Sequence, residues 1–328
     1  MTTPEETPQV PAELVDLVSR PRGKTLLLGT VQPDGDLLGS QIGLGLALAH
    51  AGTPVTLAGP QSVPEVFRFL PGAALVERWE AVPGSFDLVI LTDCPDPSRT
   101  GGLLEGARGP ATRVVNIDHH PDNKRYGDVN WIEPEASATG EMVYDLIHAV
   151  GLKVTPEIAT NLFTAIHTDT GSFRYSNTTA RALRIAADLV AQGARPAVVA
   201  GALYEGRKAE DLQRLGSLLG RVEVASDGQV AWLALPEGSV PEAFVEAEDL
   251  VIYPRSIASV KVAFLLREVG AGRVKVSLRA KGDVNVGKIA AAFGGGGHAK
   301  AAGCTIAGSL SEARDALLRA VTGALSAQ

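Results

Sequence analysis

The chain has 328 residues, enough for roughly two domains that each bury a full hydrophobic core. Its hydrophobic content of 45% and charged content of 20% are those of an ordinary globular protein. The net charge of −7 argues against a general binder of long nucleic acids, because that affinity comes mainly from phosphate neutralisation by Lys and Arg. It does not exclude small anionic ligands.

The cysteine content and the lengths of the apolar runs indicate in which cellular compartment the protein is expected. Cys94 and Cys304 are too few for a disulfide framework or a Cys-based zinc site, which fits a reducing cytoplasm. The N-terminal stretch is polar and Pro-rich, unlike a signal peptide or an anchor. No apolar run approaches the roughly 20 residues that a membrane-spanning helix needs. We therefore expect a soluble, cytoplasmic protein with no membrane partner.

The first part of the chain alternates apolar strands with helices. Continuous apolar strands separated by helical segments predict a parallel sheet with helices on both faces. In such sheets ligands bind at the carboxyl ends of the strands. In chain order we predict a helix over 11–20, a strand over 24–29, a helix over 37–51, a strand over 55–57, a helix over 64–70, and strands over 87–91 and 113–117.

From residue 137 the pattern is first helical and then mixed. Together with the preceding strands it predicts a parallel-sheet α/β domain over 12–190, a helical linker over 191–222 and a smaller, mixed-sheet α/β domain over 223–328. The predicted elements are helices over 139–150, 156–168, 178–192, 196–204 and 209–221, hairpins that turn at 226–228 and 270–272, and a closing helix over 310–325.

Acidic and imidazole side chains recur directly after predicted strands and at the end of one helix. Taken singly, an Asp in such a place is also explained as a turn or N-cap residue, and a His as a satisfied surface or core residue. The repetition at four element ends is what singles the set out. The segments are Pro33-Asp34-Gly35-Asp36, Thr92-Asp93-Cys94, Asp118-His119-His120 and Thr168-Asp169-Thr170-Gly171.

This set favours a site for divalent metal ions. Carboxylates brought together without cations raise one another's pKa and resist desolvation. Mixed Asp and His ligands without Cys suit Mn²⁺ or Mg²⁺ better than structural zinc. Two such ions about 3.5–4 Å apart would clamp the attacking water and the phosphoryl oxygens of an in-line displacement.

The four segments resemble the N-terminal motifs of the DHH phosphoesterase family, over residues 24–175. Further along, the Ser-Leu-Arg-Ala-Lys stretch over 277–281 and the glycine run ending in His298, followed by Ala-Ala-Gly over 301–303, resemble the DHH-associated C-terminal substrate domain. The resemblance therefore implies a catalytic, metal-binding DHH domain followed by a substrate-binding domain. It implies phosphoester hydrolysis by two-metal in-line attack of a metal-bound hydroxide.

The resemblance also implies a ligand set for two divalent ions, with Mn²⁺ expected first and Mg²⁺ as the alternative. Asp93 would bridge the two ions. Asp34 would bind the first ion, while Asp36, His119 and Asp169 would bind the second.

Catalytic and substrate-binding roles are implied in the same way. His120 would lie beside the scissile phosphate as a contact or proton donor to the leaving oxygen, and Asp118 would orient a histidine. Arg279 and His298 would grip a substrate phosphate remote from the cut. Backbone N–H groups of the glycine run would help, although the run alone is also explained as a flexible turn. Further substrate-binding candidates are Gly295, Gly296, Gly297, Lys281, Asn123 and Arg99.

The length of the chain is similar to that of the NrnA-type enzymes of this family. These enzymes trim very short oligoribonucleotides (nanoRNA) to mononucleotides and remove the 3′-phosphate of 3′-phosphoadenosine 5′-phosphate (pAp). We therefore expect short RNA oligonucleotides and pAp-like nucleotides as partners, with a homodimer left open. Two alternatives also stay open: a phosphodiesterase of cyclic dinucleotides or their linear products, and a non-catalytic nucleotide-binding module.

Thr30 departs from the family's first motif, which opens with a metal-binding histidine three residues before the proline. A neutral hydroxyl is a far poorer ligand than imidazole for Mn²⁺, so the first ion should bind more weakly or take an extra water. We predict an active enzyme that needs more Mn²⁺ than its Thr30→His variant. Titration of activity against Mn²⁺ checks this, and an unchanged Mn²⁺ dependence would contradict the inference about the first ion.

Overall fold

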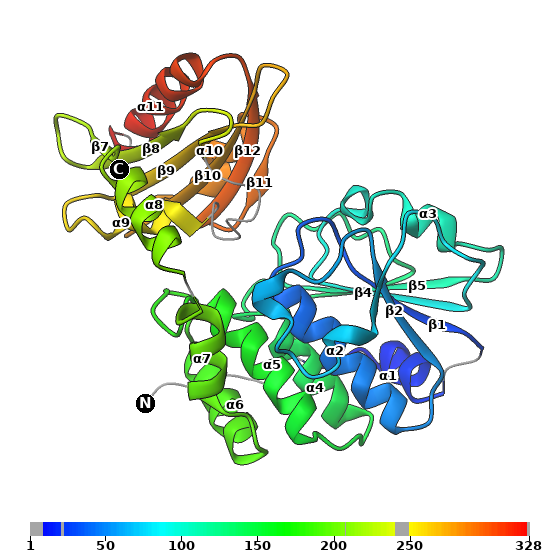
Figure 1. The fold of residues 1–328 in the computed structure, drawn as a ribbon. Helices are drawn as coiled ribbons and strands as arrows, with labels where there is room; N and C mark the ends of the chain where they lie inside the picture. The colour runs from blue at the N-terminus through cyan, green and yellow to red at the C-terminus, as the bar shows by residue number, and fades with distance from the viewer. Residues whose placement is uncertain (1–8, 21–22, 207, 240–248, 327–328) are drawn as a thin grey trace. The chain divides into compact units, whose positions relative to one another are not determined.

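The computed structural model describes residues 9–20, 23–206, 208–239 and 249–326, and divides into two compact units, Met1–Gly206 and Arg207–Gln328 (Figure 1). In the described residues each unit has its own six-stranded sheet, the first parallel and the second mixed, which confirms the predicted α/β class. The predicted linker contains α7 (Pro196–Tyr204) in the first unit and α8 (Ala209–Leu219) in the second. The boundaries at 190 and 222 stay predictions.

The strands of the first sheet run parallel in the order β3-β2-β1-β4-β5-β6. The chain moves outward from β1 in one direction to β3, and then starts again beside β1 with β4. Such a switch point opens a crevice at the carboxyl ends of the two central strands. The bounds are β1 Thr25–Leu28, β2 Val55–Gly59, β3 Val76–Arg78, β4 Leu88–Thr92, β5 Arg113–Asp118 and β6 Val129–Ile132.

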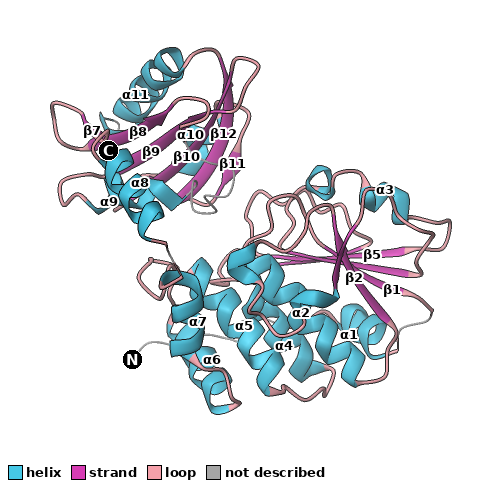
Figure 2. Cartoon of the chain, in the orientation of Figure 1, coloured by secondary structure: helices cyan, strands magenta, loops and turns pink. Residues whose placement is uncertain are grey.

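The two faces of this sheet are covered unequally (Figures 1 and 2). Because both faces are covered, strand β1 is apolar on both: Leu27 packs with the larger helical core, while Leu26 and Leu28 pack with a smaller cluster that includes α3 (Leu103–Ala107). The larger core joins the sheet to α1 (Ala12–Ser19), α2 (Gly35–His50), α4 (Thr139–Ala149), α5 (Pro156–Asp169) and α6 (Ala180–Ala191).

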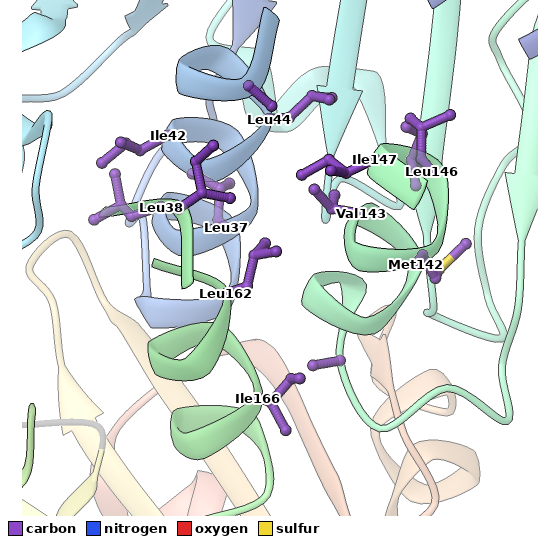
Figure 3. Close-up of a cluster of buried hydrophobic side chains, with 14 of the residues drawn as sticks. Leu37, Leu38, Ile42, Leu44, Met142, Val143, Leu146, Ile147, Leu162 and Ile166 are labelled. Carbon is purple, nitrogen blue, oxygen red and sulfur yellow. The ribbon is translucent and has the colours of Figure 1, made fainter. Parts of the chain in front are cut away.

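Helix α2, which follows the first acidic motif, is fixed by close packing against α5. A Cβ added at Gly39 would lie only 2.4 Å from the Asn161 carbonyl oxygen and 2.9 Å from the Ala165 Cβ, so glycine is required for this approach. Leucine and isoleucine side chains of α2, α4 and α5 fill the space around the contact (Figure 3). The packing therefore sets where the N-terminus of α2 lies.

The second unit is built on a sheet in the order β11-β12-β10-β9-β8-β7, in which only β8 and β9 are parallel among the described strands. Helices α10 (Val286–Ala291) and α11 (Leu310–Ser326) pack on one face, and α8 and α9 (Ile252–Ser256) on the other. The strands are β7 Glu223–Val224, β8 Val230–Leu235, β9 Val262–Glu268, β10 Arg273–Ala280, β11 Gly296–Gly297 and β12 Ala301–Ala307.

One predicted element is wrong, and others were missed. The helix over 64–70 is only a 3₁₀ turn, Glu65–Phe67, because Pro71 disfavours helical geometry in the residue before it and leaves no room for a second turn. Strand β12 was not predicted, since its Ala- and Gly-rich sequence has low β propensity. Across the described parts of the chain, no helix has both the length and the hydropathy needed to cross a membrane.

Alanine substitutions should have opposite effects at two helical glycines, one inside the close contact of α2 with α5 and one in an open position in α7. Gly39→Ala should destabilise the first unit by about 1–3 kcal/mol, because overpacking outweighs the better helix propensity of alanine. Gly201→Ala in α7, where the nearest atom to an added Cβ is 3.8 Å away, should stabilise it by up to about 1 kcal/mol. Denaturant unfolding of both variants checks this, and stabilisation by Gly39→Ala would refute the packing argument.

Candidate metal centre

Neighbouring strands deliver the candidate side chains to one edge of the first sheet. Strand β1 pairs with β4, and β4 pairs with β5. Asp93 directly follows β4, and Asp118 is the last residue of β5, so His119 and His120 begin the next loop. Asp169 reaches the same place as the last residue of α5.

His119 lies at the centre of the arrangement. Its Nδ1 is 3.0 Å from the Ala136 carbonyl oxygen; a carbonyl only accepts, so Nδ1 carries a proton and Nε2 is the nitrogen left to bind a metal ion. Nε2 lies 3.6 Å from Asp36 Oδ2, 3.6 Å from Asp93 Oδ1 and 3.7 Å from Asp169 Oδ2. Atoms that each sit about 2.1 Å from one shared ion are separated by about 3–4 Å. Asp36, Asp93 and His119 therefore have the geometry to hold a metal ion.

The N-terminus of α4 holds Asp36 in place. The backbone N–H of Thr139 donates to Asp36 Oδ2 at 2.7 Å, and that of Gly140 donates to Oδ1 at 2.9 Å. Such unpaired N–H groups at a helix N-terminus favour a carboxylate. The Thr139 hydroxyl also donates to Asp93 Oδ1 at 3.3 Å. The contacts of Thr139 and Gly140 were not predicted from the sequence, because the residue before them, Ala138, gives no capping signal for the start of α4.

Asp93 has a backbone conformation that L-residues rarely adopt, with φ at 53°. Such a conformation costs about 1–3 kcal/mol and persists only where the surroundings impose it. The Asp93 N–H donates to the Ile117 carbonyl at 2.9 Å. The carbonyl of Cys94, the residue after Asp93, accepts from Asn116 Nδ2 at 3.1 Å and from the Tyr126 hydroxyl at 2.9 Å. These bonds fix the turn that aims Asp93 at His119.

Asp118 holds His120. His120 Nδ1 is 2.8 Å from Asp118 Oδ1, and Asn123 Nδ2 donates to Asp118 Oδ2 at 2.5 Å. Burial opposes the charged imidazole, but the Asp118 hydrogen bond and the charge of Asp93 outweigh it and raise the pKa of His120 to about 9. Asp93, Asp118 and His120 also lie close enough together to hold a metal ion, but the bond between Asp118 and His120 Nδ1 suits a pair that orients His120.

The side of the centre around Asp34 offers fewer side-chain atoms that could bind a metal ion than the side around His119. Asp34 Oδ1 accepts from the Leu37 N–H at 3.0 Å and so caps α2. Asp34 keeps an exposed surface, but partial desolvation of its carboxylate and the charge of Asp93 raise its pKa to about 6. Burial and the charge of Asp93 raise the pKa of Asp36 well above its usual value. Thr30 is buried, and its hydroxyl donates to the Val31 carbonyl at 3.2 Å. Neither Asp34 nor Thr30 belongs to the two groups above.

Two substrate-binding candidates of the first unit have different surroundings. The Asn123 amide donates to Asp118 and to Asn116 Oδ1 at 2.7 Å, while its oxygen accepts from the Arg125 N–H at 2.6 Å. These contacts suit a residue that positions Asp118. Arg99 is half-buried, and its positive charge offsets a small part of the rise in the pKa of Asp34 and of His120, so it lies within electrostatic range of the centre.

The candidates of the second unit gather at one end of its sheet. Arg279 lies opposite Ala301, the first residue of β12, and His298 is three residues before it. The glycine run forms an edge strand in which Gly296 pairs with Gly303, and a Cβ at Gly295 would meet the Gly303 carbonyl at 2.1 Å. Gly297 has φ at 126°. The run therefore ends in a short edge strand, Gly296–Gly297, and has steric reasons for glycine at Gly295 and Gly297.

Lys281 lies at this end as well, directly after β10. Its Nζ donates to the Ile257 carbonyl at 2.7 Å, and burial together with the charge of Arg255 lowers its pKa. Lys281 thus has a structural contact that links the end of β10 to the segment after α9.

Comparison with known proteins identifies domains in both units. Residues 24–166 match the DHH family, N-terminal domain, and residues 244–327 match the DHHA1 domain. A solved structure from Bacteroides fragilis, an exopolyphosphatase-related protein, has the same fold, with a TM-score of 0.85 and 24% identity over 97% of this chain and 98% of that one.

Curated relatives extend the similarity to whole proteins. The chain is 36% identical over 312 residues to the bifunctional oligoribonuclease and PAP phosphatase NrnA of Thermus thermophilus, covering 94% of this chain and 92% of the relative. It is 28% identical to the protein of the same name in Bacillus subtilis, over 84% of this chain and 87% of the relative. The chain belongs to the DHH family of metal-dependent phosphoesterases, and within it to the NrnA type.

Proposed function

We propose that this hydrolase trims very short oligoribonucleotides to mononucleotides and removes the 3′-phosphate of pAp, with Mn²⁺ as its metal. The observation that carries the proposal is the similarity along both units to a relative named as a bifunctional oligoribonuclease and PAP phosphatase. The net charge of −7 and the aromatic content of 5% agree with it, because a long-strand nuclease would need a basic channel with stacking aromatics.

The proposed ligands of one metal ion are Asp36, Asp93, His119 and Asp169, whose polar atoms meet around His119 Nε2. Asp93 and Asp34 are the proposed ligands of the other ion. Oxygen donors with a single imidazole favour Mn²⁺, with Mg²⁺ as the alternative. When bound, the ions supply an activated water and neutralise charge on the phosphoryl oxygens.

The remaining residues bind, orient and move a proton. His120 is held by Asp118 through Nδ1, and this carboxylate contact favours its protonated form, so it suits a proton donor to the leaving oxygen. Arg99 supplies positive charge beside the centre for a substrate phosphate. In the second unit, Arg279 and His298 are the proposed phosphate contacts, with N–H groups of the glycine run.

The raised carboxylate pKa values predict how pH and Mn²⁺ act together on stability. Because the folded-state pKa of Asp34, about 6, lies above its unfolded value, the neutral carboxyl stabilises the metal-free fold below about pH 4, and this stabilisation is lost as pH rises through 6. At higher pH Mn²⁺ replaces the proton as balancing charge. Thermal unfolding should therefore show a larger rise in Tm on adding Mn²⁺ at about pH 7.5 than at about pH 5.

At 100 times Kd the metal should add about 2.7 kcal/mol of stability at the higher pH. An Asp36→Asn variant, which keeps the volume of the side chain but loses its charge, should lose most of the shift. Equal shifts in Tm at the two pH values would count against carboxylate ligands.

A substrate panel tests the proposed activity. The purified chain with Mn²⁺ should turn over pAp and short linear RNA from the dimer (linear diadenylate included) to the pentamer, and should act poorly on cyclic diadenylate. Product analysis by chromatography checks this. Turnover of cyclic or linear diadenylate without turnover of pAp or the pentamer would support the dinucleotide phosphodiesterase instead, and tight binding without turnover of any substrate would support a non-catalytic module.

Two arginines of β10 provide a matched pair for the same assay. Arg279→Ala should lower kcat/KM for pAp about 10–100-fold, as expected for loss of a charge-assisted phosphate contact. Arg273→Ala, at the other end of the strand opposite Ala307, should leave it unchanged. Equal effects of the two variants would argue against a specific phosphate contact at Arg279.

A further inference from the structure

Asp169 is held differently from the other candidate ligands. Its side chain is 30% exposed, whereas those of Asp36 and Asp93 are 2% and 5% exposed. It is the last residue of α5, and residues 171–173 that follow all have left-handed backbone, with φ between 56° and 62°. The unusual backbone of this turn persists only where surrounding contacts impose it, so contacts to the end of α5 also set where Asp169 lies.

Asn177 provides such a contact. Its Nδ2 donates to the Asp169 carbonyl at 3.1 Å and lies 3.4 Å from Asp169 Oδ2. The same nitrogen donates to the Ser137 carbonyl at 3.0 Å. The Asn177 carboxamide therefore contacts both the backbone carbonyl and the carboxylate of Asp169, and links them to the segment that precedes α4.

The segment that Asn177 reaches also holds the other ligands. The carbonyl of Ala136, next to Ser137, is the partner of His119 Nδ1. The N–H groups of Thr139 and Gly140 bind Asp36. A shift of Asp169 away from this segment would therefore separate it from the group around His119 Nε2.

A buried charge network anchors the segment in turn. Glu141 Oε1 accepts from the Ser137 N–H at 3.2 Å and also from its hydroxyl. Glu141 Oε2 accepts from Arg181 Nη1 at 2.6 Å, and Arg181 also pairs with Asp145. Glu141 is 1% exposed, so its charge is stable there only while Arg181 and Ser137 remain bound to it. The network fixes Ser137 and, through it, the anchor of Asn177.

We propose that Asn177 is a positioning residue of the metal centre: it orients Asp169 toward His119 by tying α5 to Ser137, which the Arg181–Glu141 pair fixes in place. This inference rests on the proposed role of Asp169 as a metal ligand. Contacts of this kind around metal ligands typically contribute 10–100-fold in metal affinity.

The test is calorimetric titration of Mn²⁺ into the full, metal-stripped chain and its variants. Asn177→Ala should bind Mn²⁺ about 10–100-fold more weakly at the centre. Asn177→Leu, which keeps the volume but removes the donor, should show the same loss. The matched control is Asn161→Ala, because Asn161, like Asn177, donates its side-chain amide to two carbonyls, those of Pro71 and Glu157.

Asn161→Ala should lower the thermal stability of the metal-free chain and leave its Mn²⁺ affinity unchanged. If the wild-type chain binds no Mn²⁺ at this centre, the proposed function fails and the positioning role fails with it. If the wild-type chain binds Mn²⁺ and either folded Asn177 variant binds it as tightly, the metal centre stands and the positioning role is overturned.

Discussion

The mutual repulsion of buried carboxylates is the constraint on which the rest of the first unit depends. Three carboxylates, of which Asp36 and Asp93 are buried, meet within 3.7 Å of His119 Nε2. Ionised carboxylates this close resist desolvation, as the raised pKa of Asp36 indicates. A divalent cation removes this cost, so the same groups that disfavour the metal-free site favour the metal-bound one. The metal dependence of the family follows from this electrostatic requirement.

Hydrogen bonds from main-chain groups hold the charged side chains in place despite their mutual repulsion. The N-terminus of α4 supplies two N–H donors to Asp36, and a carbonyl beside it sets the tautomer of His119. Strained backbone at Asp93 adds a cost that the bonds to Cys94 and Ile117 offset. The site is therefore fixed by the ends of secondary-structure elements, whose positions are in turn fixed by the core, as the glycine contact between α2 and α5 illustrates.

The fold class and the clustering of the site could be predicted from local patterns in the sequence. Apolar runs predicted the parallel strands, and the rule that ligands bind at strand ends brought Asp36, Asp93 and His119 together. Asp169, at the end of a helix, joined them because acidic motifs recur at element ends. The contacts of Thr139 could not be predicted in this way, because its hydrogen bond to Asp36 joins residues 103 positions apart. The hydrogen bond from Asn123 to Asp118 and the pairing of the glycine strand β11 with β12 could not be predicted either, because the fold decides which partners these residues meet.

The most direct measurement of the central claim is a crystal structure of the chain grown with Mn²⁺, with the ions located by anomalous scattering. The account predicts two anomalous peaks, both within ligand distance of Asp93, with one of them also bound by Asp36, His119 Nε2 and Asp169. Mn²⁺ that binds only elsewhere, or a centre in which His119 Nε2 does not contact the ion, would contradict it.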